Sequence, residues 1–484
     1  MAFESTKATL KQNKLFTSTK VEVVKEVDVD FNIDKILSVK AMSRVLSKEC
    51  NDGLVKIVGK TKIDLITLVG NEIKTVFQDV EWTKNVEASL IGEPVIIIKE
   101  EMVGFELLEK PLVKIDVNLD VYGAVMDVMP SINIDDDSIV LKEQNNTIQS
   151  IVGNVFNTFT LTQEFEEVTS YEILSKEAKI NKTNVVCGVD AYIVEGVVEV
   201  CIQAKESDKY MEIKKEIAFK QELPFAQMLP THKIINRLKI STLMATISQK
   251  DEKQTLLIAL DVDDNAIAIM EQDVKTLADV YCLTNTIETS EECIKVVEKN
   301  EVVVRQQQIT AISELDEVVQ DILFVSNCNV ENVKVVEDSV VGNFVCDVIF
   351  RSADDIVNCV KQNQAFSVEL NQKTDNEILD VNVSLLAARL KYGNQIEVSA
   401  SLEVSVNEVK NSYLVYVTEV NKKEEVERSE AAMQVYVVKE NEDLFDVGKA
   451  LGVTIDQIKA QNENIENVIA GQKIIIYNKL TAEN

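Results

Sequence analysis

Two stretches of the sequence approach the patterns of known ligand-binding loops. The run GLVKIVGKT, which begins at Gly53, is close to a phosphate-binding P-loop. It has five residues between its glycines where the motif has four, and it continues as an alternating strand. The run that begins at Asp261 places Asp263 and Asn265 at calcium-ligand spacing, but Ala266 stands where the loop needs a glycine. We therefore expect neither a phosphate loop nor a calcium loop.

The residue types that most often carry nucleophilic or metal chemistry are scattered. Eight cysteines occur without a C-x-x-C pair, several of them inside apolar runs such as VVCGV, and we interpret them as buried free thiols in a reducing cytosol. The single histidine, His232, excludes zinc sites built on histidine pairs. Among 81 acidic residues no pair is marked as a tuned acid and base. We predict a non-enzymatic protein with no catalytic residues, no cofactor and no metal site.

The charge and the hydropathy of the chain limit its partners. Its 50 lysines and arginines stand against 81 acidic residues, and the formal net charge of −31 repels phosphate backbones and anionic membrane surfaces. The longest apolar runs have only the length of a strand, well below the roughly 20 residues that span a bilayer. Residues 1–16 lack the apolar stretch of a secretory signal. We expect a cytoplasmic protein that binds no nucleic acid and does not insert into a membrane.

A short apolar signature marks an internal repeat. It reads ILS at Ile36 and Ile173 and ILF at Ile322, so the copies begin about 140 residues apart. After each copy, in nearly the same register, come a strand with one glycine and then a strand with one aromatic residue. These are Gly59 and Trp82, Gly196 and Phe219, and Gly342 and Phe366. The long period predicts tandem domains, since solenoid units span roughly 20 to 50 residues.

The strands that close the repeats indicate the fold class. Between Val113 and Val121, and again over residues 396–406, apolar and polar residues alternate with the period of a strand that has one wet face. We predict a mainly β protein with three sandwich-like domains, and a core position for Trp82, because its counterparts are phenylalanines. The expected boundaries are 1–155, 156–300 and 301–420, followed by a charged linker at 421–432 and a small domain at 433–484.

The last part of the sequence changes from strands to helices. After the strand VYVV, Asp443 can cap a first helix and Gly452 supplies a left-handed stop. Thr454 and Gln457 form a capping box for a second helix, and KIIIY is a return strand. The pattern predicts a small α+β unit with the order strand, helix, helix, strand.

Residues 434–478 resemble a LysM domain. The family's G-D-T-L-W-x-I-A corresponds to NEDLFDVG from Asn441, its L-N-P-N to QNEN from Gln461, and its P-G-Q-x-L to AGQKI from Ala470. The resemblance implies a binding groove between the loop before the first helix and the loop after the second. The groove residues it implies are Asn441, Glu442, Asp443, Leu444, Phe445, Asn464, Ile465, Val468 and Ile469.

The family commonly binds glycans that contain N-acetylglucosamine, such as peptidoglycan. This sequence departs from the family pattern at the motif glycine and at both prolines, and its first loop carries Glu440, Glu442 and Asp443. Because a glycine lets the backbone approach a ligand closely, its loss makes a protein at least as good a candidate for the ligand as a glycan.

The order of the domains resembles a second family. Three β-rich repeats followed by a LysM domain are similar to the SPOCS-repeat spore-coat morphogenetic proteins of the SipL type, over residues 20–420. The motifs are the ILS signature and the strands with Trp82, Phe219 and Phe366. The resemblance implies a scaffold of the mother-cell cytoplasm, recruited to the forespore surface, whose LysM domain binds the SpoIVA-type ATPase scaffold of the coat. Tandem repeats also favour self-association. The alternative is a peptidoglycan-binding protein of the cell wall or spore cortex.

Overall fold

The computed structural model describes residues 5–51, 53–88, 91–132, 136–250, 253–370, 375–392, 394–426, 432–463 and 465–477. These residues form antiparallel β-sheets and, near the end of the chain, a small unit with two short helices. The predicted fold class, mainly β with a small α+β domain, is therefore confirmed. Within this described part, no helix has the length and apolar character needed to cross a membrane.

Six strands form the first β-sandwich. They are β1 (Ser5–Glu26), β2 (Lys35–Asn51), β3 (Leu54–Val69), β4 (Glu72–Glu87), β5 (Ile91–Leu107) and β6 (Pro111–Ile132). One sheet has the order β1-β6-β5 and the facing sheet has the order β2-β3-β4. Every second residue of β6 from Val113 to Val121 is fully buried between the sheets, which confirms the predicted period of two.

The same arrangement occurs twice more. The second repeat contains β7 (Ile139–Glu167), β8 (Glu172–Cys187), β9 (Ala191–Glu206), β10 (Lys209–Pro224), β11 (Lys233–Lys250) and β12 (Lys253–Cys282). The third contains β13 (Asn285–Glu314), β14 (Val319–Val336), β15 (Ser339–Ser352), β16 (Val357–Glu369), β17 (Asp375–Lys391) and β18 (Gln395–Glu425). In each repeat the first strand pairs with the sixth, and the second to fourth strands form the facing sheet. The sequence repeat is thus a repeat of one fold.

The boundaries between the repeats lie at other positions than the sequence suggests. The expected boundaries at 155/156 and 300/301 fall inside β7 and β13, which are continuous strands. The changes of repeat lie before β7 and between β12 and β13. The charged segment expected as a linker begins within β18, where Lys423 lies 2.6 Å from Glu288 of β13. Opposite charges on paired strands favour such a continuation of the ladder.

Each repeat glycine lies opposite the repeat aromatic residue on the neighbouring strand. The pairs are Gly59 with Trp82, Gly196 with Phe219, and Gly342 with Phe366. A Cβ atom on Gly59 would stand 2.1 Å from the ring of Trp82, so the glycine leaves the space that the ring occupies. Trp82 is buried and donates from Nε1 to Oγ1 of Thr61 over 3.0 Å. The core position predicted for Trp82 is confirmed.

The three-residue signature is a β-bulge at which the repeats meet. The pairing register shifts there in β2, β8 and β14. The isoleucines, Ile36, Ile173 and Ile322, belong to or pack against the core of their own sandwich. The leucines that follow, Leu37, Leu174 and Leu323, are buried together in one cluster. Because a bulge redirects a side chain, the signature joins the three repeats to one another.

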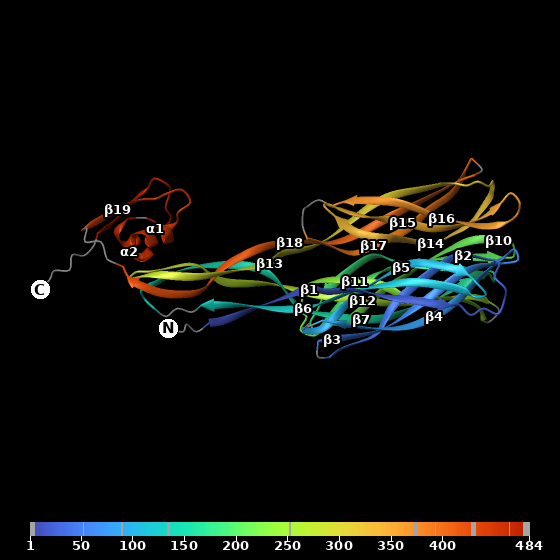
Figure 1. Cartoon of the computed structure of the whole chain (residues 1–484), viewed down its shortest axis with the longest axis horizontal. Helices are drawn as coiled ribbons and strands as arrows, with labels where there is room; N and C mark the ends of the chain where they lie inside the picture. Colours follow the sequence, from blue (N-terminus) through green and yellow to red (C-terminus); the bar gives the residue numbers. More distant parts are fainter. Residues whose placement is uncertain are drawn as a thin grey trace.

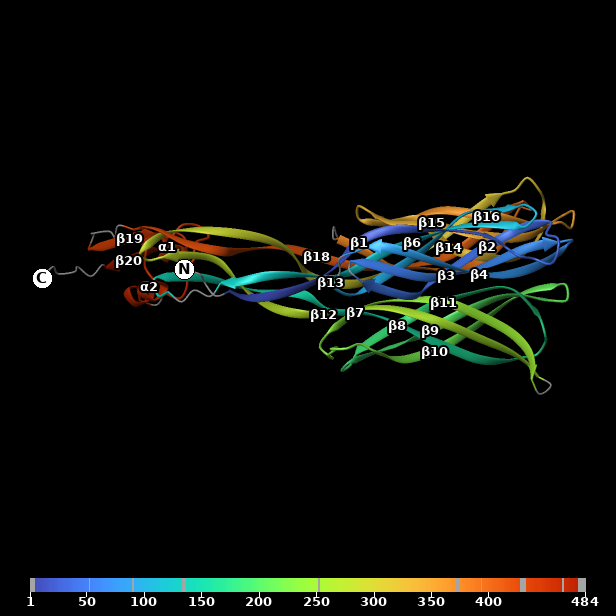
Figure 2. The ribbon, with the colours of Figure 1, turned by 60° about the horizontal axis from the view of Figure 1, so that its bottom comes forward.

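Ion pairs also cross between the repeats. Arg237 of β11 lies 2.6 Å from Glu377 of the third repeat, and its guanidinium carbon is 5.8 Å from the ring centre of Tyr122 in the first. Arg237, whose side chain is only 11% exposed, therefore belongs to the second repeat and contacts both of the others. Lys239 lies 2.7 Å from Glu100 of the first repeat. The three sandwiches therefore form one body (Figure 1 and Figure 2).

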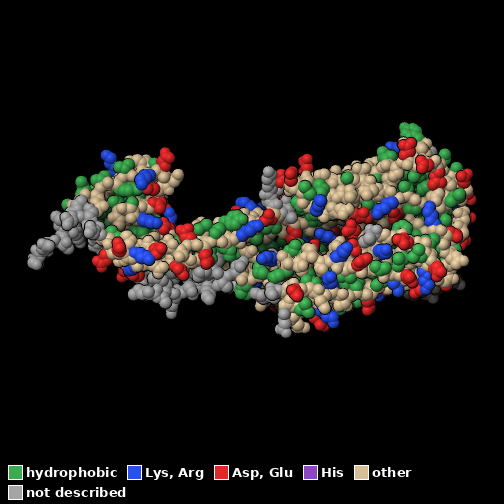
Figure 3. All heavy atoms as spheres, viewed as in Figure 1, with side chains coloured by type: hydrophobic (Ala, Val, Ile, Leu, Met, Phe, Trp, Pro, Cys, Tyr) green, Lys and Arg blue, Asp and Glu red, His purple; other side chains and the backbone are tan. Residues whose placement is uncertain are grey.

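A narrow stalk extends from this body. The pairs β1–β6, β7–β12 and β13–β18 continue beyond the sandwiches, and Figure 3 shows the thin neck that they make. The stalk has its own apolar interior, which includes Leu10, Ile148, Val274, Val296 and Leu414 and, in a second cluster, Ile139, Val280 and Val420. It holds the helical unit of the chain away from the body.

The helical unit lies at the end of the stalk. It consists of β19 (Met433–Val437), α1 (Leu444–Leu451), α2 (Ile455–Gln461) and β20 (Lys473–Tyr477). β19 and β20 pair as an antiparallel two-stranded sheet. Its core is separate from those of the repeats and contains Val438, Leu444, Val447, Ile458, Ile474 and Ile476. The predicted order of strand, helix, helix and strand is confirmed.

Candidate functional site

Capping residues fix both loops that lead into the helices of the βααβ unit. The carboxylate of Asp443 accepts hydrogen bonds from the amides of Phe445 and Asp446 over 2.9 and 3.0 Å. Gly452 ends α1 with φ of 67°. Thr454 and Gln457 exchange hydrogen bonds of 3.1 and 3.0 Å at the start of α2. The caps that the sequence predicts are thus present, and they fix the backbone where each helix begins.

Most of the first loop is occupied by contacts within the unit. Glu442 accepts hydrogen bonds from the hydroxyl of Tyr436 and the amide of Lys439, each over 2.7 Å. The Lys439 amide, followed by the Tyr436 hydroxyl, lowers the pKa of Glu442 below its usual range. Leu444 belongs to the core, and Asn441 is exposed with φ of 64°. Of the loop residues, Glu440, Asn441 and Asp443 are exposed.

The side chain of Phe445 lies outside the core of its own unit and packs against the stalk. Its ring centre lies 4.9 Å from that of Tyr281 on β12, with the rings at 68° to each other. The hydroxyl of Tyr281 donates to the carbonyl oxygen of Val453 over 2.7 Å, and both rings are 4% exposed. Burial raises the pKa of Tyr281 to about 12. The sequence places Phe445 in a ligand groove, whereas the structure covers it with the chain's own strand.

A glycine inside helix α1 makes this contact possible. A Cβ atom on Gly448 would lie 2.5 Å from the hydroxyl oxygen of Tyr281 and 2.9 Å from the carbonyl oxygen of Val453. Glycine in a helix interior costs about 1 kcal/mol relative to alanine. The packing of Tyr281 gives a physical reason for a glycine at this position of an eight-residue helix.

Ion pairs surround the aromatic contact. Lys142 of β7 lies 2.7 Å from Asp443 and 3.7 Å from Asp446, with its ammonium 5.3 Å from the ring centre of Phe445. The bond to Asp443 raises the pKa of Lys142. Burial acts to raise the pKa of Asp443, but the Lys142 ammonium and the Asp446 amide hold it below its usual range. Lys449 contacts both carboxylate oxygens of Asp279 at 2.8 and 2.7 Å.

The second loop of the predicted groove, which follows α2, remains largely uncovered. Ile465 and Val468 are partly buried against the core of the unit, and Ile469 is 73% exposed. Asn464 lies outside the described residues. Of the predicted groove residues that the structure describes, Asn441, Asp443 and Ile469 are exposed; the stalk covers Phe445 and pairs with Asp443, whose side chain is still 53% exposed.

Sequence reasoning missed the stalk residues that complete this site. Lys142, Asp279 and Tyr281 belong to the second repeat, far from the βααβ unit in the sequence, and no spacing rule connects them to it. One signal was present: Gly448 stands inside the segment between Asp443 and Gly452 that the caps predict as a helix. A glycine in such a place indicates that something approaches the helix closely.

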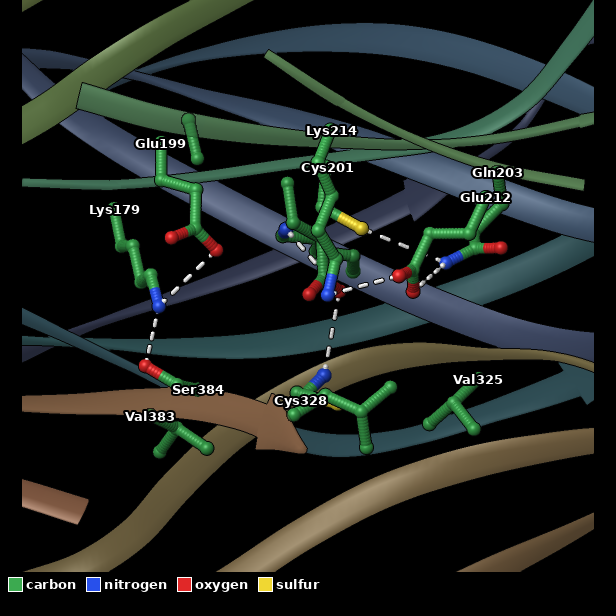
Figure 4. Close-up of a pocket in the computed structure, with 14 residues that line it drawn as sticks. Lys179, Glu199, Cys201, Gln203, Glu212, Lys214, Val325, Cys328, Val383 and Ser384 are labelled. Carbon is green, nitrogen blue, oxygen red and sulfur yellow. Dashed lines mark hydrogen bonds and ion pairs between the residues drawn. The ribbon is translucent and has the colours of Figure 1, made fainter. Parts of the chain in front are cut away.

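A small cavity of about 100 Å³ lies between the second and third repeats (Figure 4). Lys179 lies 3.2 Å from Glu199 and also bonds Ser384 of β17, and Lys214 lies 2.9 Å from Glu212. In the same cavity, burial raises the pKa of Cys201 to about 12, so its thiol stays protonated. Both ion pairs lie within the second repeat, and the bond of Lys179 to Ser384 joins this repeat to the third.

A larger cavity of about 520 Å³ lies where the three repeats meet. Residues of β2 and β5 line it, together with residues of the corresponding strands β8, β11, β14 and β17. Lys239 and Glu100, which pair with each other, are among the lining residues. Asp380 also lines it, and burial raises the pKa of this carboxyl to about 6. Asn382 donates to Asp380 over 2.7 Å.

The structure also places the residues that imitate ligand loops. Asp261 and Asp263 lie within β12, where Asp261 pairs with Arg44 at 3.1 Å and Asp263 accepts from Thr158 at 2.9 Å. The run from Gly53 forms β3. Nδ1 of His232 accepts a hydrogen bond from the amide of Leu229. All of these residues have structural partners in strands or turns.

The cysteines are less uniformly buried than expected. Cys282 and Cys346 are buried, but Cys50 and Cys293 are exposed, and the other four are intermediate. Cys50 lies at the polar end of β2 and Cys293 follows two glutamates inside β13, so neither stands in a purely apolar run, which is why the burial rule fails there.

The βααβ order, its capped helices and its two loops define a small binding module. Residues 436–476 match the family model of the LysM domain, so the chain contains a LysM domain in this region. Such a domain indicates binding of peptidoglycan or a related carbohydrate, or a role as a protein-interaction module. No curated protein and no solved structure matches the chain.

Proposed function

We propose that this chain is a non-enzymatic adaptor of endospore coat assembly. Its LysM domain binds a protein of the coat, and its three β repeats serve as spacer and as further interaction surfaces. The proposal draws on the LysM match, on the resemblance of the repeats to SPOCS domains, and on a stalk that carries the LysM domain away from the body.

One observation favours a protein over a glycan as the ligand. The first loop of the LysM domain is acidic, and its Phe445 and Asp443 already contact Tyr281 and Lys142 of the stalk. A glycan chain lying along the groove would need that loop to be open. A protein partner can bind the exposed second loop around Ile469 without disturbing the stalk contact.

The cavities support a non-enzymatic role. Some of their lysines and carboxylates pair across the repeats, as Lys239 does with Glu100 and Lys40 with Glu177, and Lys179 pairs with Glu199 within the second repeat. Groups that satisfy one another at an interface between domains stabilise its geometry and leave little free for proton transfer.

The partner that we propose is the ATPase scaffold of the SpoIVA type in the basement layer of the coat. The protein would then act in the mother-cell cytoplasm and accumulate at the forespore surface. Contacts of the LysM domain and the repeats with one layer would reinforce each other, because the second contact becomes intramolecular.

Peptidoglycan is the second candidate, and the LysM match itself favours it. Exposed Ile469 and Asn441 could contact a sugar at the uncovered end of the groove. A protein with this ligand would act in the cell wall or the spore cortex.

Two binding assays with the full-length chain separate these functions. We expect the purified coat ATPase to retain the chain, and purified peptidoglycan not to sediment it. Ile469→Asp should reduce retention at least tenfold, whereas Val168→Asp, at a residue that is 97% exposed and remote from the LysM domain, should not. Sedimentation with peptidoglycan without retention by the ATPase would favour the second candidate. A fluorescent fusion that stays diffuse throughout sporulation would count against both the coat role and the proposed location.

A further inference from the structure

The contact between the LysM domain and the stalk tip (Lys142, Asp279 and Tyr281) has the anatomy of a protein–protein interface. Its centre is aromatic and buried, since Tyr281 and Phe445 are each only 4% exposed. Its rim is charged and partly solvated, with the side chains of Lys449 and Asp279 46% and 34% exposed. Aromatic anchors inside a charged rim are typical of surfaces that recognise a partner.

The element recognised is an extended strand that carries the pattern Asp-x-Tyr. Asp279 and Tyr281 are two residues apart on β12. Tyr281 lies between Phe445 and Gly448 and donates to the carbonyl oxygen of Val453, and Asp279 receives Lys449. Each of the two strand residues therefore meets its own partner on the face of α1.

Nothing in this contact requires both sides to belong to one chain. The LysM domain is connected to β18 through residues 426–432, which can span at most about 25 Å. A short connection of this kind gives a high effective concentration, so the contact forms within the chain when copies are dilute. A second copy presents the same Asp279 and Tyr281 at the end of the same stalk, and the LysM domains lie at one end of an elongated molecule, where two copies can meet (Figure 1).

We propose that the α1 face of the LysM domain, formed by Phe445, Gly448, Lys449 and Val453, is a receptor for the Asp-x-Tyr strand of a second copy of this chain. Two copies exchange LysM domains reciprocally, and each domain then docks on the stalk tip of the other. The exchanged contacts are the same as those within the chain, so exchange loses only the advantage of the tether and is favoured by a high local concentration. This interface lies on α1 and is independent of the coat role proposed above.

Charge reversal in the full-length chain tests the proposal. Lys449→Glu and Asp279→Lys each place like charges across the contact. In each variant the LysM domain should therefore separate from the stalk tip of its own chain. Hydrogen exchange of the amides in residues 444–453 should become on the order of tenfold faster in either single variant, because the interface loses an ion pair and gains a repulsion. The double variant restores opposite charges and should exchange like the unmodified chain.

Mixing the two single variants tests exchange between copies. In the mixture each reversed side chain meets an opposite charge only on the other variant, so sedimentation should show a species of twice the mass that neither variant forms alone. The matched control reverses Lys233 and Glu271, a pair 2.7 Å apart on the body whose side chains are 58% and 56% exposed. Its single variants should leave the amides of residues 444–453 unchanged and form no dimer on mixing.

Each contrary result overturns a definite part of the inference. Unchanged hydrogen exchange in both single variants would show that the LysM domain does not dock through this face. Faster exchange with no dimer in the mixture, at concentrations up to the solubility limit, would show that the face accepts only its own stalk. Neither result bears on retention by the coat ATPase, so a failure here is distinguishable from a failure of the proposed function.

Discussion

The hydroxyl of Tyr281 donates a hydrogen bond to the carbonyl oxygen of Val453 over 2.7 Å, between residues 172 positions apart in the chain. Through this bond the second β repeat holds the LysM domain in a definite orientation. The binding module is therefore part of the folded architecture of the chain, and its available surface depends on the state of the stalk contact.

Replacing Tyr281 should release the LysM domain. Tyr281→Ala removes a buried ring with its aromatic partner and its hydrogen bond, and we expect a loss of docking free energy of about 3 kcal/mol, roughly a hundredfold in the docking constant. Tyr281→Phe keeps the ring and loses only the hydrogen bond to Val453, which is worth about 1 kcal/mol. Hydrogen exchange of residues 444–453 measures both effects. Equal protection in the two variants would contradict the central role of the ring.

The leucines of the repeat signature should matter for the assembly of the body. Leu174 is 1% exposed and lies in the cluster shared by the three repeats. We expect Leu174→Ala to lower the free energy of unfolding by about 2 to 5 kcal/mol, because it leaves a cavity between rigid sandwiches. Urea denaturation followed by tryptophan fluorescence measures the loss. Val168→Ala, at an exposed position of the same repeat, should change stability by less than about 0.5 kcal/mol; a similar loss in both variants would contradict the role of the cluster.

The glycine–aromatic pairs should be coupled energetically. The Cβ atom introduced by Gly59→Ala would lie 2.1 Å from the ring of Trp82, so the ring must move, at a cost of about 1 to 3 kcal/mol. Adding Trp82→Phe should recover part of this loss, because phenylalanine fills the corresponding position in the other two repeats. A double-mutant cycle of urea denaturation measures the coupling, expected to exceed about 0.5 kcal/mol. Strictly additive effects would mean that the ring and the glycine do not compete for the same space.

The sequence contains enough information to predict the repeats and the βααβ unit, because both depend on local patterns. The alternation along β6 and the caps at Asp443 and Thr454 each involve residues close together in the chain. The spacing of Gly59 and Trp82 also follows from a local feature, the hairpin that places them on adjacent strands.

The relations between distant parts could not be predicted. The same ILS pattern that reveals the repeat gives no indication that Leu37, Leu174 and Leu323 meet, since a bulge redirects them only in the folded strand. The boundaries at 155 and 300 were misplaced because β7 and β13 each run through the stalk and the sandwich as one strand, and the turns that separate the repeats lie earlier, at residues 136–138 and 283–284. The groove was predicted as open because the strand that covers Phe445 comes from another repeat.

A buried carboxyl in the second repeat should give the stability of the protein a distinctive pH dependence. Asp264 is fully buried and accepts a hydrogen bond from the hydroxyl of Tyr192 over 2.8 Å. Burial outweighs this bond and raises the pKa of Asp264 from 3.8 to about 7. Between these two pH values the folded state binds a proton that the unfolded state has released. The contribution of Asp264 to stability is therefore fully present below pH 3.8 and is lost as the pH rises to about 7.

The variant Asp264→Asn isolates this effect, because the amide keeps an acceptor for Tyr192 and does not titrate. Relative to the variant, the unmodified chain should lose about 4 kcal/mol of unfolding free energy between pH 4 and pH 7, from three pKa units at about 1.4 kcal/mol each. Urea denaturation of both proteins at four pH values gives this difference, in which the titration of all other carboxylates cancels. A difference that stays constant with pH would mean that Asp264 is ionised in the folded protein, and that Tyr192 and its neighbours stabilise the charge.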